Sequence, residues 1–141
     1  MDSTGGSDGN IDPQSIAERI TPRTRAIMAV NLLGNPNDFA RIQALTEGRG
    51  IVLMEDNCES MGASLGGKPC GTFGDVNTFS TFFSHHISTM EGGMLLTNST
   101  EVDHLARVIR NHGWSRDVPP ESDLFERRSD GFFEAYRFIM P

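Results

Sequence analysis

The chain's only lysine and its one pair of adjacent histidines could each carry chemistry. Lys68 lies in the turn Gly66-Gly67-Lys68-Pro69, where we expect it to be solvated, and His85-His86 come well after it. An imidazole accepts or donates a proton near neutral pH, but it cannot form a Schiff base as a lysine amine does. Any reaction of this chain that needs a lysine must therefore use Lys68 or proceed without one. For a lone histidine, packing or exposure would be the default interpretation.

Three further polar side chains lie where a ligand could reach them. Asp56 follows the apolar run Ile51–Met54, and an aspartate there could hold a ligand or cap a following helix. Glu59 is three residues further on, so on a helix it would face the same ligand, or complete a capping interaction. The Ser80 hydroxyl could donate to an anion, or Ser80 could simply be a small packed residue.

Apolar runs and helix-capping residues alternate along the chain and predict an α/β fold with a mostly parallel sheet flanked by helices. The strands are expected at 26–30, 51–54, 76–83 and 94–97, with a hairpin tip at 66–69. Three helices are expected. The first is capped by Asp12 and runs from 13 to about 21, and the second is capped by Asn37 or Asp38 and runs to about 47. The third is capped by Asn98 or Ser99 and runs to about 111. The continuous apolar runs at 26–30 and 51–54 predict strands buried on both faces.

The helical segments also predict which side chains are buried. Phe39, Ile42 and Leu45 share one face of the second helix. The third helix has the buried stripe Val102, Leu105, Ala106 and Ile109. Residues 1–10, rich in glycine, serine and aspartate, are predicted to be a disordered lead-in, and residues 115–131 to be loop.

Composition limits the function classes. A formal net charge of −7 argues against a nucleic-acid partner, which requires a basic surface. Cys58 and Cys70 have no metal-binding spacing, so we expect reduced thiols and no metal site. No apolar run approaches the roughly 20 residues that span a bilayer. The first residues do not resemble a signal peptide, and these features together predict a soluble cytoplasmic protein without a membrane partner.

Three motifs, Asp56–Ala63, Gly74–Ser80 and Ser84–Gly93, resemble in order and spacing the DegT/DnrJ/EryC1/StrS family of nucleotide-sugar aminotransferases and dehydratases. The resemblance extends from about Asn10 and corresponds to the middle of a longer protein. It implies pyridoxal 5′-phosphate or pyridoxamine 5′-phosphate as cofactor. It also implies that residues 11–141 are a partial large domain of the type I fold of pyridoxal-phosphate transferases (aspartate aminotransferase-like), without its N-terminal segment and C-terminal small domain.

The same resemblance implies roles for single residues. Asp56 matches the aspartate that pairs with the cofactor's pyridine nitrogen, Glu59 a residue near the ring hydroxyl, and Ser80 a serine that contacts the phosphate. His85 stands where most members have the lysine that holds the cofactor covalently, and is expected to be the catalytic base. His112 and Trp114, expected to follow the third helix, could approach the sugar or nucleotide, or equally serve capping and packing.

Histidine in place of that lysine resembles one subgroup, the GDP-4-keto-6-deoxymannose 3-dehydratases of colitose biosynthesis. The motifs Val30–Pro36 and Ile109–Trp114 favour this subgroup, and a CDP-4-keto-6-deoxyglucose 3-dehydratase is the alternative. The expected partners are the nucleotide sugar, L-glutamate as amino donor and a second copy in a homodimer. Two other interpretations are an inactive relative of the sugar aminotransferases and a truncated product. We expect these 141 residues alone to be inactive.

Overall fold

The computed structural model describes residues 8–124 and 137–139, which form two compact units divided at residues 96 and 97. The first unit contains an α/β arrangement with a mostly parallel sheet, as the sequence predicts. Asn10 is buried, and its side-chain amide donates to the carbonyls of Asn35 and Pro36 at 3.0 and 3.1 Å. The predicted disordered lead-in therefore does not extend to Asn10, whereas residues 1–7 lie outside the described part.

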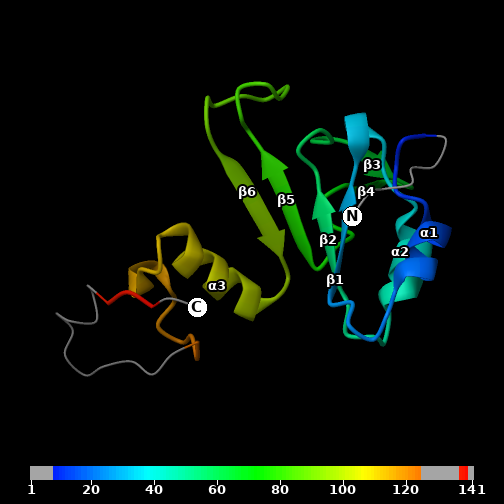
Figure 1. Cartoon of the computed structure of the whole chain (residues 1–141). Helices are drawn as coiled ribbons and strands as arrows, with labels where there is room; N and C mark the ends of the chain where they lie inside the picture. Colours follow the sequence, from blue (N-terminus) through cyan, green and yellow to red (C-terminus); the bar gives the residue numbers. More distant parts are fainter. Residues whose placement is uncertain (1–7, 125–136, 140–141) are drawn as a thin grey trace. The chain divides into compact units, whose positions relative to one another are not determined.

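The sheet has four strands in the order β1-β2-β5-β6, which are Ala26–Val30, Val52–Asp56, Val76–Ser80 and Gly93–Thr97. β1, β2 and β5 are parallel, with Val30 paired to Asp56 and Asp56 to Thr78. β6 runs in the opposite direction beside β5 (Figure 1). A small hairpin, β3 (Ser64–Leu65) and β4 (Lys68–Pro69), forms at the predicted turn. The parallel strands thus end at one edge of the sheet.

Two helices pack on one face of this sheet. α1 (Pro13–Arg19) begins at Asp12, whose carboxylate accepts from the Gln14 and Ser15 amides. The Ser15 side chain, followed by these amides, lowers the pKa of Asp12. α2 (Phe39–Thr46) follows the short 3-10 turn Leu32–Gly34 and is capped by Asp38, which accepts from the Arg41 amide at 3.1 Å. Both caps are as predicted, because each aspartate satisfies amides that have no partner within the helix.

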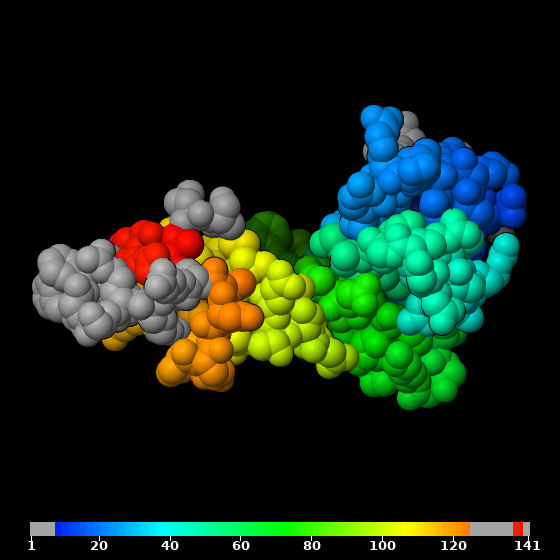
Figure 2. Space-filling model, turned by 90° about the horizontal axis from the view of Figure 1, so that it is seen from below, coloured from blue at the N-terminus to red at the C-terminus, as the bar shows by residue number. Residues whose placement is uncertain are grey.

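The core lies between these helices and the strands. Its buried members are Ile16, Ile27, Ala29, Phe39, Ile42, Ile51 and Leu53. Phe39 stacks on Phe73 with ring centroids 4.5 Å apart, and Leu45 packs at the margin, so the predicted face of α2 is confirmed. In the space-filling view, the blue segment that contains α1 adjoins the cyan segment that contains α2 (Figure 2).

The opposite face of the sheet is not covered by the described residues. Met28, Val30 and Val52 are 53%, 40% and 40% exposed, whereas Ile27, Ala29 and Leu53 between them are buried. The prediction that β1 and β2 are buried on both faces is therefore wrong for the described residues. An apolar run indicates that both faces of a strand can be buried. The groups that bury those faces, however, come from other parts of the fold.

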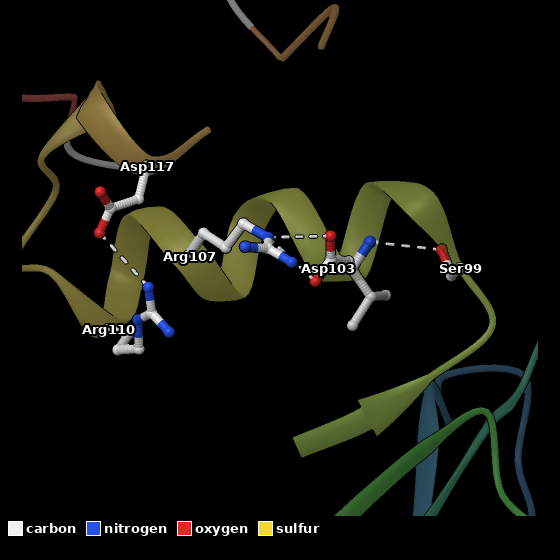
Figure 3. A network of polar contacts seen from close by, with 6 residues as sticks. Ser99, Asp103, Arg107, Arg110 and Asp117 are labelled. Atoms are coloured by element: carbon white, nitrogen blue, oxygen red, sulfur yellow. Dashed lines mark hydrogen bonds and ion pairs between the residues drawn. The ribbon is translucent and has the colours of Figure 1, made fainter. Parts of the chain in front are cut away.

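The second unit contains α3 (Thr100–Arg110) and the 3-10 turn Ser115–Asp117. Ser99 caps α3, and the ion pairs Asp103–Arg107 and Arg110–Asp117 measure 3.0 and 3.3 Å (Figure 3). The Arg107 hydrogen bond lowers the pKa of Asp103 and, reciprocally, raises that of Arg107. The buried residues of α3 are His104 and Val108, while Ile109 is 58% exposed. The predicted stripe is thus wrong at Ile109, and it omitted His104.

Candidate functional site

Asp56 is the last residue of β2, at the edge where the parallel strands end. Its carbonyl accepts from the Asn31 amide at 3.0 Å, and its Oδ1 accepts from the Cys58 amide at 3.0 Å. The segment after Asp56 is a turn and not a helix, so the alternative role of helix cap does not apply. Asp56 is half-buried and belongs to the less covered face of the sheet, because it alternates with the buried Glu55.

The thiol of Cys58 is held in its neutral form beside this carboxylate. Burial, then a hydrogen bond to Asp56 and the charges of Asp56 and Glu59, raise the pKa of Cys58 to about 11. Burial and the charge of Glu55 also raise the pKa of Cys70. Neither cysteine is therefore suited to act as a thiolate nucleophile near neutral pH.

Glu59 does not lie one helical turn from Asp56, as the spacing had suggested, because residues 58–59 form a turn. Its Oε2 accepts from the Leu33 amide at 2.8 Å. Leu33 has a φ of 52°, in the left-handed region that side chains disfavour, so this hydrogen bond supports a strained turn after β1. The other carboxylate oxygen has no partner among the described residues.

Ser80 ends β5, two residues beyond the partner of Asp56 in the sheet register. Its hydroxyl oxygen accepts from the Phe82 amide at 3.1 Å. A hydroxyl can accept and donate at once, so the Ser80 proton remains available to an anion. Asp56 and Ser80 therefore leave adjacent parallel strands at the same edge.

His85 lies in the loop that connects β5 to β6. Its amide donates to the Phe82 carbonyl at 3.0 Å, and its ring meets the Phe82 ring edge-on with centroids 6.5 Å apart. His85 is half-buried, and His86 is exposed. Lys68 is exposed in the β3–β4 hairpin, with its ammonium 4.5 Å from the centre of the Phe73 ring. The chain's lysine is thus outside the loop that carries the histidines.

Two threonines close the base of this loop, and sequence reasoning did not identify them. The Thr81 and Thr89 hydroxyl oxygens are 2.8 Å apart, and the Thr89 hydroxyl donates to the Glu91 carbonyl at 2.9 Å. The Thr81 amide donates to the Gly92 carbonyl at 3.0 Å, and the Thr89 amide donates to the Thr81 carbonyl at 2.9 Å. We call this arrangement the threonine neck. Only contacts across eight residues reveal it, so no local pattern could have indicated it.

A buried polar network beside Asp56 was also not predicted. The Glu55 carboxylate is 1% exposed and accepts four hydrogen bonds. Oε1 accepts from Asn31 Nδ2 at 3.0 Å and from the Gly71 amide at 2.6 Å. Oε2 accepts from the Phe73 and Gly74 amides at 3.0 and 3.4 Å. A glutamate at the end of an apolar strand, with Asn57 two residues later, was the available signal.

His112 and Trp114 belong to the second unit. His112 has a φ of 56° just after α3 and is exposed. The Trp114 ring stacks on Phe138 with centroids 6.0 Å apart, and Arg116 lies over it at 5.2 Å. These are the contacts of the packing alternative, and a role in substrate binding stays a prediction.

Within the first unit, one sheet edge therefore carries a half-buried aspartate, a strand-end hydroxyl and a histidine loop. No three metal-ligating side chains are grouped for a metal ion in the described part of the chain. None of the helices among these residues is long and apolar enough to cross a membrane. A carboxylate, a hydroxyl and an imidazole at such an edge can hold a polar ring, an anion and a transferable proton.

Comparison with known proteins places this arrangement in a family. The DegT/DnrJ/EryC1/StrS aminotransferase family matches residues 4–128. The chain belongs to this family. GDP-4-keto-6-deoxy-D-mannose 3-dehydratase of Yersinia pseudotuberculosis is 52% identical over 133 residues, 94% of this chain. The chain spans about a third of that relative's length, 34%.

Solved structures agree with the family assignment. Escherichia coli GDP-4-keto-6-deoxy-D-mannose-3-dehydratase with bound hydrated PLP is 48% identical, with a TM-score of 0.84 over 94% of this chain and 34% of that one. A GDP-4-keto-6-deoxymannose-3-dehydratase with a trapped PLP-glutamate geminal diamine gives 48% and 0.85, over 94% of this chain and 35% of that one. The family member described here thus has the α/β fold of pyridoxal-phosphate-dependent aminotransferases, as predicted, represented by part of a domain.

Proposed function

We propose that this chain is the cofactor-binding segment of a pyridoxal-phosphate-dependent 3-dehydratase of a nucleotide-linked 4-keto-6-deoxy sugar, with GDP-4-keto-6-deoxymannose as the favoured substrate. The observation that carries the proposal is His85 in the loop after β5, together with a single lysine in a separate hairpin. The similarity to the Yersinia dehydratase supports the reaction and the nucleotide. The CDP-sugar reaction remains the alternative.

The residues at the sheet edge fit the cofactor chemically. Asp56 offers a carboxylate to the protonated pyridine nitrogen, where an opposite charge stabilises the charged ring. The Ser80 hydroxyl has a proton to donate to the phosphate, and Glu59 keeps one carboxylate oxygen for the ring hydroxyl. When bound, the cofactor supplies an electron sink that makes the bond from sugar C3 to its hydroxyl breakable.

His85 carries the proton transfer in this proposal. With the cofactor bound, its imidazole would accept the proton released next to the amino group, and the C3 hydroxyl would take up a proton and leave as water. Unlike a lysine amine, His85 would form no covalent bond with the cofactor. L-glutamate is the proposed amino donor, and ammonia the expected co-product. Without a lysine to recapture the cofactor, the site disfavours a standard aminotransferase cycle.

The homodimer and the cytoplasmic location belong to the same proposal, as do the sugar or nucleotide contacts of His112 and Trp114. The assignment of residues 11–141 to part of a large cofactor-binding domain also belongs to this proposal. We expect the 141 residues alone to be inactive, because the chain covers only about a third of the relatives' length, 34%. The assays below therefore use the full-length protein.

The decisive assay incubates the full-length protein with pyridoxal phosphate, L-glutamate and GDP-4-keto-6-deoxymannose. A 3-deoxy sugar and ammonia are expected, whereas an amino sugar would contradict the dehydratase assignment. No turnover with intact cofactor binding would favour an inactive relative. As a control, borohydride should leave no pyridoxal phosphate covalently attached to this segment, and attachment to Lys68 would contradict the lysine-free site.

A further inference from the structure

Glu55 is a buried carboxylate that the proposed mechanism does not use. Its four partners, Asn31 Nδ2 and the amides of Gly71, Phe73 and Gly74, are all uncharged. No cation contacts it among the described residues. Burying a polar side chain is costly unless its atoms are hydrogen-bonded, and these four bonds satisfy both carboxylate oxygens. Glu55 therefore attaches the loop at 71–74 to β2.

The asparagines extend this attachment to the segments after β1 and β2. Asn31 Nδ2 also donates to Asn57 Oδ1 at 2.9 Å, and the same Oδ1 accepts from the Ser60 hydroxyl at 2.9 Å. Asn31 Oδ1 accepts from the amide and side chain of Asn37 at 3.0 and 2.9 Å. Asn31, Asn37, Asn57 and Ser60 are at most 2% exposed. One network thus joins three segments at the edge where Asp56 lies.

Asp56 is held on both sides by members of this network. The preceding residue is Glu55, the following residue is Asn57, and the Asn31 amide donates to the Asp56 carbonyl. Successive side chains of a strand point to opposite faces. The network therefore occupies the helix-covered face and fixes the backbone from which the Asp56 carboxylate extends on the other.

We propose that Glu55 is a positioning residue for Asp56: its buried carboxylate fixes the end of β2 so that the Asp56 carboxylate stays in one orientation. This inference rests on the proposed function where it concerns the cofactor. Both of its oxygens accept from N–H donors, so neither position can be occupied by a donor without loss of hydrogen bonds. In Glu55→Gln, one oxygen becomes an NH₂ group that faces donors, so hydrogen bonds to Asn31 and Gly71, or to Phe73 and Gly74, are lost.

The test compares Glu55→Gln with Leu53→Ala in the full-length protein. Leu53 is 2% exposed, belongs to the same face of β2 two residues earlier, and contributes packing without side-chain hydrogen bonds. Leu53→Ala therefore supplies a matched loss of stability with the network intact. The readouts are thermal midpoint, amide hydrogen exchange, and the dissociation constant of pyridoxal phosphate from absorbance titration.

The Cys58 amide reports on Asp56 directly, because it donates to Asp56 Oδ1. At a comparable fall in thermal midpoint, Glu55→Gln should accelerate exchange at Cys58, Gly71, Phe73 and Gly74 by about tenfold or more. It should weaken pyridoxal phosphate binding by about ten- to hundredfold, as when groups that orient metal ligands are removed. Leu53→Ala should do neither.

Equal effects of the two variants, or unchanged exchange at Cys58 in Glu55→Gln, would overturn the positioning role. If Glu55→Gln does not fold, Ser60→Ala serves instead: it removes one bond to Asn57 and should accelerate Cys58 exchange by a smaller factor. No acceleration there would equally overturn the role. If the wild-type protein binds no pyridoxal phosphate, the proposed function fails, and Cys58 exchange still decides the role of Glu55.

Discussion

The two halves of the candidate site are held in different ways. Asp56 extends from a central strand whose end is fixed by a buried network of four hydrogen bonds to Glu55. His85 lies on a loop whose base is closed by the threonine neck, and whose Phe83 and Met90 are 65% and 76% exposed. In the proposed function, the half with more buried hydrogen bonds would hold the cofactor, and the more exposed loop would carry the base.

His85→Asn should produce the largest effect. We expect activity of the full-length protein to fall by about 10²- to 10⁴-fold, the usual contribution of a general base. Pyridoxal phosphate affinity should stay within a few-fold of wild type, since Asp56 and Ser80 are untouched. Product formation measures the activity, and absorbance titration measures the affinity for pyridoxal phosphate. The matched control is His86→Asn, whose activity should be near that of the wild type. Full activity in His85→Asn would contradict the assignment of His85 as the base.

Replacing a phenylalanine by alanine should destabilise the protein much more in the core beneath the sheet than in the histidine loop. Phe39 is fully buried and stacks on Phe73, so Phe39→Ala should lower the free energy of unfolding by about 3–5 kcal/mol. Phe83→Ala, in the histidine loop, should change it by about 0.5 kcal/mol or less. Denaturant unfolding of the full-length protein gives both values. Comparable losses would show that the loop is packed as firmly as the core.

Cys58 should report the charge of Asp56. With a pKa raised to about 11 from the ordinary 9.0, its thiolate fraction at pH 8 is about a hundredfold below that of a free cysteine. Iodoacetamide should therefore label Cys58 slowly in a Cys70→Ser background, and faster as the pH rises towards 11. Asp56→Asn should accelerate labelling only partly, because burial, the largest cause of the shift, remains. Labelling at the rate of a free thiol would contradict this environment.

Thr89→Val should produce the smallest effect, confined to the histidine loop. It removes the hydroxyl bonds to Thr81 and Glu91, each worth about 0.5–1.5 kcal/mol. If the equivalent of about one such bond is lost from the transition state, kcat should fall about three- to tenfold. Pyridoxal phosphate affinity should not change. Thr72→Val is the control, since it loses one bond to the Pro69 carbonyl in another loop. A loss of affinity in Thr89→Val would show that the threonine neck also supports the strand end that carries Asp56.

Local patterns predicted the elements well. Asp12, Asp38 and Ser99 cap the helices as expected, because a cap depends on two or three neighbouring residues. The apolar runs located the strands for the same reason. The strand predicted at 76–83 ends at Ser80, where the Ser80 hydroxyl accepts the Phe82 amide and the chain turns into the loop.

Features that depend on distant contacts were not predicted. Glu55 meets partners 16 to 24 positions away, and His104 is buried although its neighbours in sequence gave no sign of it. Glu59 was assigned to a helical turn, yet Asp56 forms a turn with Cys58 and directs the chain elsewhere. For the candidate site, the strand-end position of Asp56 followed from the sequence, but its supporting network did not.

The uncovered face of the sheet has a practical consequence for handling this polypeptide. Met28, Val30 and Val52 are exposed, and among the described residues β1 is an edge strand that pairs with a neighbour on one side only. Such an edge is a template for further strands, and an apolar face favours self-association. Expressed as an isolated piece, these residues should tend to aggregate as concentration rises, and charged substitutions at Met28 and Val52 should delay that onset.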